Sequence, residues 1–193
     1  MEMNVATLNA VTAAQAIGGD ITVLVAGKDC SAAAADVAKI DGVTVVKVVD
    51  SPEYENGLAE NVAGLIVNMS NDYSHVLATA TASAKNIMPR VAALLDMQQI
   101  SEITEVLDDS TFVRPIYAGN AMATVKSSDA IKIITVRGTA FEAAKPDGGT
   151  ASIQNESFAG DAGLSAYLGS ELSESERPDL TSARIVVSGG RGM

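Results

Sequence analysis

The sequence predicts an α/β domain of three layers, in which a mostly parallel sheet carries helices on both faces. Two observations lead to this fold class. Nearly continuous β-branched runs, such as Ile21–Ala26 and Val43–Val49, are typical of strands covered on both faces. Stretches between these runs repeat their apolar residues with the period of a helix. The alternation of the two patterns therefore favours a doubly wound layer.

The first half of the chain supplies most of these elements. Helices are expected over 4–17, from a cap at Ser31, over 58–69 and over 83–95, with strands over 21–26, 43–49 and 73–80. The run 63–69 could alternatively be a buried strand, but its helical period holds for three turns. Pro89 lies inside the last helix, which predicts either a late start or a kink there.

The second half changes to shorter strands, expected over 102–107, 112–118, 121–127 and 131–137. Gly119-Asn120 lies between two of them and is a turn signal that joins antiparallel strands. Some antiparallel pairing is therefore expected in this half. The whole pattern is Rossmann-like or adenine-nucleotide-hydrolase-like.

The composition divides the chain into three regions. Residues 1–142 form an N-terminal α/β scaffold domain, and residues 143–182 form an acidic linker or edge segment. Between residues 140 and 180 there are eight acids and two bases, which is more typical of a solvated segment than of a binding surface. Residues 183–193 contain a strand, Ala183–Ser188, that leads into a glycine turn.

Both ends of this pattern are unusual for a parallel α/β layer. A helix comes first with no strand before it, and the last strand enters a glycine turn with no helix after it. We therefore expect a fragment whose first strand is missing. Five buried apolar side chains contribute roughly 1.5–3 kcal/mol each, against a typical net stability of roughly 5–15 kcal/mol. The chain is expected to be marginally stable unless a partner or a second copy fills the gap.

Charge and composition exclude several classes of function. The chain has 24 acids and 13 bases, for a net charge of −11, which argues against nucleic-acid partners and anionic membrane surfaces. No apolar run approaches the roughly 18 residues that span a bilayer, so no membrane insertion is expected. The first four residues do not begin a signal peptide. A single cysteine suggests a reducing compartment, so the sequence indicates a soluble intracellular protein.

Few residues could carry catalysis. His75 is the only histidine and Cys30 the only cysteine, so a zinc site of nitrogen and sulfur ligands cannot be assembled. A helix dipole could lower the pKa of Cys30, yet a buried cysteine is the better interpretation. Asp72-Tyr73-Ser74-His75 is contiguous and alternates in direction, so it cannot converge as a triad. We interpret His75 as structural.

The acidic residues do not indicate a site either. Asp108-Asp109 and the pair Glu102 and Glu105 could suggest paired carboxylates, but no basic or metal partner is evident, and we interpret them as solvated. The turn Ser188–Gly192 is the most site-like feature. Its glycines allow close approach of a ligand to the backbone, and Arg191 offers a planar cation suited to a phosphate or an electron-rich ring. Taken alone, such a turn is weak support for a site.

Four blocks of sequence, in order and over nearly the whole chain, resemble the alpha subunit of the electron transfer flavoprotein family. They are Lys85–Ala93, Arg114–Ala121, Val136–Phe141, and Arg177–Leu180 leading to Val186–Gly192. The resemblance implies an electron carrier and not an enzyme. It also implies that the complete protein holds FAD, which would accept electrons from acyl-CoA dehydrogenases and related flavoenzymes and pass them to a membrane-bound ubiquinone oxidoreductase.

The resemblance also implies a beta-subunit partner, contacted by the second-half strands and the region Arg114–Ala121. Arg191 matches an arginine of the family's FAD site. Most of the FAD-binding domain would lie beyond this chain, so tight FAD binding by the fragment is not expected. The implied compartment is the cytoplasm of a bacterium, or the mitochondrial matrix in a eukaryote.

Three alternative interpretations remain at this stage. One is a paralogue in an electron-bifurcating or nitrogen-fixation-linked chain. Another is an ATP- or AMP-binding α/β domain, although Ala26-Gly27-Lys28-Asp29 is a poor phosphate loop. The third is an interaction module without a ligand.

Overall fold

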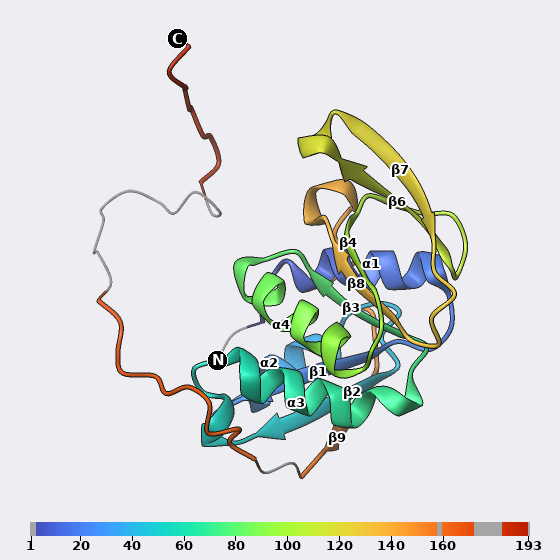
Figure 1. Ribbon diagram of the computed structural model, residues 1–193. Helices are drawn as coiled ribbons and strands as arrows, with labels where there is room; N and C mark the ends of the chain where they lie inside the picture. The colour runs from blue at the N-terminus through green and yellow to red at the C-terminus, as the bar shows by residue number, and fades with distance from the viewer. Residues whose placement is uncertain (1–2, 158–159, 172–182, 193) are drawn as a thin grey trace.

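The computed structural model describes residues 3–157, 160–171 and 183–192 (Figure 1). Its α-helices are α1 (Thr7–Ile17), α2 (Ser31–Val37), α3 (Ala59–Met69) and α4 (Ala82–Leu94). Its strands are β1 (Thr22–Gly27), β2 (Val45–Asp50), β3 (His75–Thr79), β4 (Gln99–Ile103), β5 (Glu105–Val106), β6 (Thr111–Ile116), β7 (Ala121–Lys126), β8 (Lys132–Val136) and β9 (Ser152–Asn155). Short 3-10 turns are η1 (Pro52–Tyr54), η2 (Ser70–Asp72), η3 (Tyr117–Gly119) and η4 (Gly138–Ala140).

The strands form three small sheets. Two are parallel, with the orders β1-β2-β9 and β3-β8-β4, and the third is an antiparallel meander, β5-β6-β7. The prediction of a mostly parallel α/β fold with antiparallel strands in the second half is confirmed. The hairpin predicted around Gly119-Asn120 is the β6–β7 hairpin, in which Ile116 pairs with Ala121.

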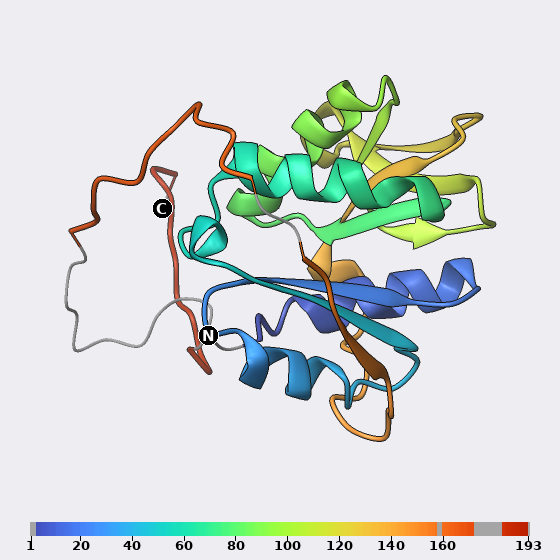
Figure 2. The same ribbon diagram turned by 90° about the horizontal axis from the view of Figure 1, so that it is seen from below.

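Helices cover both faces of the parallel strands, because successive strand residues point to opposite sides. On β2, Val46 and Val48 pack into a core with α2, whereas Val49 packs with Leu65 of α3. Figure 2 shows α2 and α3 on opposite sides of β1 and β2. In the other sheet, β8 is the most buried strand, with Ile133, Ile134 and Val136 fully enclosed.

Most predicted elements of the first half form at the predicted places. The run 63–69 is helical and belongs to α3, which confirms the helical interpretation. Helix α4 begins at Ala82 and runs through Pro89, so the late start is wrong; Thr81 caps its first turn by accepting a hydrogen bond from the Ala84 N–H. The cap predicted at Ser31 is also wrong, because Ser31 is the first residue of α2 and follows Cys30.

The strand predicted over 102–107 is two strands. Residues up to Ile103 belong to β4 and pair in parallel with β8, whereas Glu105 and Val106 form β5 and pair antiparallel with β6. The change occurs where the β4–β8 register shifts between Ile100 and Ile103, and Glu102 there has φ of 53°. A left-handed residue cannot continue a regular strand, so the chain leaves one sheet and enters another.

The later regions also differ from the predicted pattern. Within the acidic region, Ser152–Asn155 adds β9 as a parallel edge strand to β2. The strand predicted over 183–188 is absent from the described residues 183–192. A strand needs a hydrogen-bonded neighbour, and Ile185 and Val187 are instead 78% and 93% exposed. This stretch runs apart from the sheets in Figure 1.

Candidate functional site

An ion-pair cluster lies at the irregular end of β4. The Glu102 carboxylate accepts hydrogen bonds from Arg137 Nε at 3.2 Å and Arg137 Nη2 at 2.8 Å, and Lys85 Nζ lies 2.5 Å from its other oxygen. Hydrogen bonds from Lys85 and from Arg137 hold the pKa of Glu102 below its usual value. The prediction that Glu102 is a solvated acid without a basic partner is therefore wrong. These partners lie 17 and 35 residues away in sequence and come together only in the fold.

The same bend ties the β6–β7 hairpin to the parallel sheet. Arg114 Nε of β6 donates to the Ser101 carbonyl at 2.8 Å, and the Glu102 N–H donates to Thr135 Oγ1 of β8 at 2.9 Å. Three of the four blocks noted in the sequence thus supply Lys85, Arg114 and Arg137 to one place. The charged side chains of this cluster pair with one another, and the Arg114 contact fixes the β6–β7 hairpin against β4.

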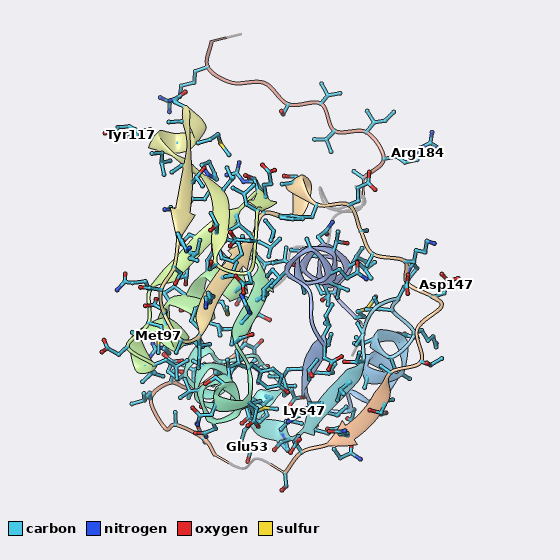
Figure 3. All side chains as sticks on the ribbon, turned by 90° about the vertical axis from the view of Figure 1, so that its right-hand side faces the viewer. Lys47, Glu53, Met97, Tyr117, Asp147 and Arg184 are labelled. Atoms are coloured by element: carbon cyan, nitrogen blue, oxygen red, sulfur yellow. The ribbon has the colours of Figure 1, made fainter. Side chains whose placement is uncertain are left out.

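The tip of the β6–β7 hairpin exposes large apolar side chains to solvent. Tyr117 is 82% exposed and Met122 is 55% exposed. Figure 3 shows Tyr117 at the end of the hairpin, directed away from the body of the molecule. Tyr117 and Ala118 have φ of 50° and 54°, a region that costs a non-glycine residue roughly 1–2 kcal/mol. Exposed apolar side chains on a strained turn are typical of a docking surface.

Arg191 lies in an open stretch near the end of the described chain. It is exposed, and a Cβ placed on Gly190 or Gly192 would meet no atom within 4 Å. The backbone beside Arg191 is therefore unobstructed by the described residues. The residues described around it do not form an enclosure for an isoalloxazine ring. The predicted role of Arg191 stays a prediction.

The other two candidates are structural. His75 Nδ1 lies 2.8 Å from Ser74 Oγ, and its Nε2 lies 2.6 Å from the Asp109 carbonyl oxygen. Because its second partner is a main-chain carbonyl and not a carboxylate, His75 belongs to no triad. Cys30 is fully buried. Burial, together with the nearby Asp50 charge, raises the pKa of its thiol, the opposite of activation by a helix dipole.

The loop after β1 is not available to a phosphate. Asp50 at the end of β2 accepts hydrogen bonds from the N–H groups of Asp29 and Cys30, at 2.9 and 3.1 Å. These are the donors that a phosphate cradle would use, and a carboxylate already occupies them. In the described residues, no three His, Cys, Asp or Glu side chains gather as a metal site would require.

These features define a class: an α/β scaffold domain that presents a braced, exposed hairpin. None of the helices in the described part of the chain is long and apolar enough to cross a bilayer. A family model named electron transfer flavoprotein domain matches residues 1–160. The chain belongs to the electron transfer flavoprotein family.

Several relatives agree with this assignment. Over 97% of its length, the chain is 59% identical to electron transfer flavoprotein subunit alpha of Pseudomonas aeruginosa and 53% identical to that of Paracoccus denitrificans. It is 48% identical to the mitochondrial alpha subunit of Dictyostelium discoideum, again over 97% of its length. The chain spans 61%, 60% and 57% of the length of these three relatives.

Proposed function

We propose that this chain is the scaffold and partner-binding part of an electron transfer flavoprotein alpha subunit. In the complete protein, electrons pass from acyl-CoA dehydrogenases and similar flavoenzymes to a membrane ubiquinone oxidoreductase. FAD, when bound, supplies the one-electron chemistry, and the protein is a carrier that transforms no substrate of its own. The alpha-subunit names of the relatives support this proposal.

The observation that carries the partner-binding role is the hairpin tip. It combines exposed Tyr117 and Met122 with a strained backbone, and the contact of Arg114 with β4 fixes its direction. A rigid exposed aromatic is a favourable anchor for a protein partner, because little side-chain entropy is lost on binding. We propose that this tip contacts the beta subunit.

The proposed division of the chain follows from the same assignment. Residues 1–142 would be the scaffold, residues 143–182 an edge segment, and residues 183–193 the beginning of the FAD-binding domain. Arg191 would contribute one cationic contact to FAD, with the backbone of Gly190 and Gly192 leaving room for it. One such contact does not hold a dinucleotide, so FAD would not be retained by this chain alone. The proposed compartment is a bacterial cytoplasm, or the mitochondrial matrix in a eukaryote.

The proposal is tested by mixing the chain with an electron transfer flavoprotein beta subunit and measuring affinity by calorimetry. We expect a one-to-one complex that Tyr117→Ser weakens about 30-fold, because a central interface tyrosine contributes about 2 kcal/mol. Tyr167→Ser is the matched control, since Tyr167 is also exposed but lies outside the hairpin. Absence of a complex would contradict the partner-binding role. Equal weakening by both substitutions would contradict its assignment to the hairpin.

A further inference from the structure

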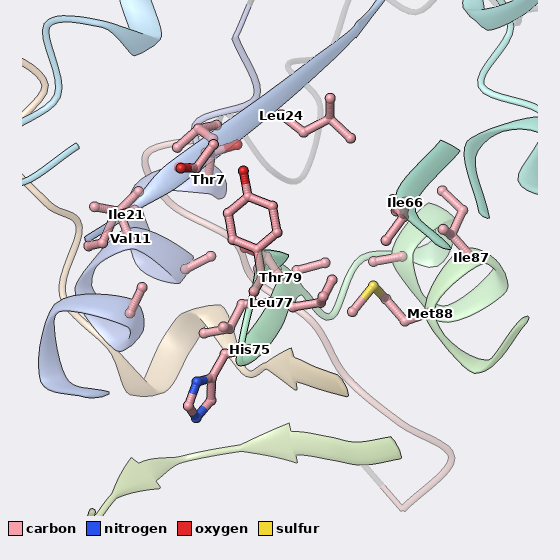
Figure 4. A pocket seen from close by; sticks show the side chains of 18 of the residues that line it. Thr7, Val11, Ile21, Leu24, Ile66, His75, Leu77, Thr79, Ile87 and Met88 are labelled. Atoms are coloured by element: carbon pink, nitrogen blue, oxygen red, sulfur yellow. The ribbon is translucent and has the colours of Figure 1, made fainter. Parts of the chain in front are cut away.

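A cleft of about 490 Å³ lies between β1 and β3, and Figure 4 shows apolar side chains around it, among them Leu77 and Met88. A smaller cavity, of about 180 Å³, lies between the beginning of β4 and the end of β7, and its lining is of a different kind. Two cations, Arg114 and Lys126, border it together with polar groups of β4 and β7. A water molecule needs only about 10–15 Å³ of such a volume, so the cavity has room for a ligand of several atoms.

Arg114 reaches this cavity with part of its guanidinium unused. Its Nε donates to the Ser101 carbonyl at 2.8 Å, and the side chain is half-buried. In the described part of the chain, neither of its terminal nitrogens, Nη1 and Nη2, has a hydrogen-bond or ion-pair partner. The guanidinium fork matches the geometry of carboxylate and phosphate oxygens. The cavity is therefore bordered by a cation that is held in place and still has donors to offer.

The free edge of β4 adds a main-chain donor. The Lys132 N–H donates to a carbonyl at the beginning of β3 at 2.9 Å, so the next residue of β8, Ile133, directs its backbone groups toward β4. Ile133 is aligned with Gln99, and in a parallel pair only one of two aligned residues directs its N–H and C=O to the other strand. The backbone groups of Gln99 therefore face away from β8, on the side of the cavity that this residue lines.

Ser127 supplies a further donor. Its Oγ accepts from the Asp129 N–H at 3.2 Å, which leaves the hydroxyl hydrogen for a ligand, because a hydroxyl has one donor and two acceptor sites. The Asp129 carboxylate accepts from the Gln98 N–H at 2.8 Å. That N–H points toward β8, opposite to the Gln99 N–H. Among the described residues, no carboxylate lines the cavity, so its donors are open to an anion.

One acceptor in the cavity distinguishes between anions. Gln99 Nε2 donates to Ser101 Oγ at 2.8 Å, whereas Gln99 Oε1 is buried and has no hydrogen-bond partner among the described residues. A buried acceptor without a donor is unfavourable, so a ligand that brings a donor of its own is preferred. At neutral pH inorganic phosphate keeps at least one P–OH group, whereas sulfate and carboxylates carry acceptors only.

We propose that this cavity is a binding site for inorganic phosphate. The phosphate oxygens accept from the terminal nitrogens of Arg114, the Gln99 N–H and the Ser127 hydroxyl, while the P–OH donates to Gln99 Oε1. The exposed Lys126 adds a second positive charge. The ligand joins β4 to the base of the β6–β7 hairpin, whereas Tyr117 lies at the tip. Phosphate binding by the chain alone therefore does not depend on the proposed beta-subunit contact.

Titration of the 193-residue chain with sodium phosphate, in a buffer free of other oxyanions, tests the site by proton–nitrogen NMR. We expect one-to-one saturation with a Kd of about 1 mM or lower, with the largest shifts at the Gln99 amide and Arg114 Nε–H and none at Ile153 of β9. Sulfate at the same ionic strength should bind at least about tenfold more weakly, because it brings no donor for Gln99 Oε1. Equal binding of the two anions, or no saturable shift, would overturn the proposal.

Substitutions on the chain provide a second readout. Gln99→Met removes the acceptor and keeps an unbranched side chain, so it should lower the affinity for phosphate to that for sulfate and leave sulfate binding unchanged. Lys126→Gln should weaken both anions. Lys145→Gln, which removes one exposed positive charge outside the cavity, should leave both unchanged.

The two lysine variants separate a built site from general attraction of anions to the surface. Equal weakening by Lys126→Gln and Lys145→Gln would show surface attraction only and would overturn the proposal. If Gln99→Met does not fold, the ratio of phosphate to sulfate affinity in the unmodified chain still decides. A Gln99→Met variant that folds and keeps its preference for phosphate would overturn the assigned role of Gln99 Oε1.

Discussion

Glu102 offers a sharp test of how the fold is held together, because its side chain and its backbone have opposite effects on stability. The carboxylate accepts hydrogen bonds from Arg137 and pairs with Lys85, while the residue has φ of 53°. The side chains of Lys85 and Arg137 are 54% and 41% exposed, so solvent screening limits each pair to roughly 0.2–1 kcal/mol. Glu102→Gln should therefore destabilise the chain by about 1 kcal/mol.

Glu102→Gly loses the same ion pairs but relieves the left-handed backbone. Relief contributes roughly 1–2 kcal/mol, and the added freedom of glycine in the unfolded chain costs roughly 0.5–1 kcal/mol. The glycine variant should therefore be at least as stable as the glutamine variant, although glycine normally weakens a strand. Urea unfolding with linear extrapolation measures the difference, with Lys39→Gln in the exposed pair with Asp36 as a near-neutral control. A glycine variant less stable than the glutamine variant by more than about 1 kcal/mol would refute the backbone argument.

The stability difference between the unmodified chain and Glu102→Gln should depend on pH, because the pKa of Glu102 is lowered in the folded chain. Its contribution is fully present above the unfolded-state pKa, near 4.5, and is lost as the pH falls through the lower folded-state pKa. The stability gap between the unmodified chain and Glu102→Gln should thus be constant near neutral pH and close in acid. A gap that widens on acidification contradicts the ion-pair account.

Three further predictions concern two glycines, a buried hydroxyl and a buried thiol. Gly149→Ala should destabilise the chain by about 2 kcal/mol or more, because the new methyl group would collide with the Ile40 carbonyl. Gly64→Ala on α3, where a methyl group would meet no atom within 4 Å, should instead stabilise the chain by about 0.5–1 kcal/mol. Thermal unfolding of the two variants measures both effects. Tyr54→Phe should be neutral or stabilising by about 1 kcal/mol in urea melts, because the buried Tyr54 hydroxyl has no hydrogen-bond partner among the described residues; a loss above about 2 kcal/mol would reveal a partner. Cys30 should react slowly with a thiol reagent in the native chain and rapidly in urea, because its thiol is buried with a raised pKa; rapid native labelling would contradict this burial.

The sequence predicts helices and strands well where the spacing of nearby apolar residues determines them. The β-branched runs become β1 and β2, and the apolar period of 58–69 becomes α3. The bend at Glu102 could not be predicted in this way, because it depends on Lys85, Thr135 and Arg137, all distant in sequence. Locally, Glu102 lies in a short β-like run, and such a run predicts an uninterrupted strand and no bend.

The site was only partly predictable for a similar reason. Tyr117 lies in a block that the resemblance associates with a partner surface, but its exposure and strain depend on how the hairpin is anchored through Arg114. Residues 183–188 have the composition of a strand, yet no strand forms in the described stretch, because pairing requires a neighbour. Composition gives the tendency of a segment, and only the fold supplies the partner.

The central proposal is that this chain supplies a scaffold and a docking surface, while FAD would be held mainly by residues outside it. It is tested by saturating the purified chain with FAD, removing unbound cofactor by gel filtration, and recording the visible absorbance together with the intact mass. The account predicts the mass of the 193-residue chain with no flavin absorbance. Flavin retained in equal stoichiometry on a chain of that mass would contradict it and would place the cofactor site within these residues.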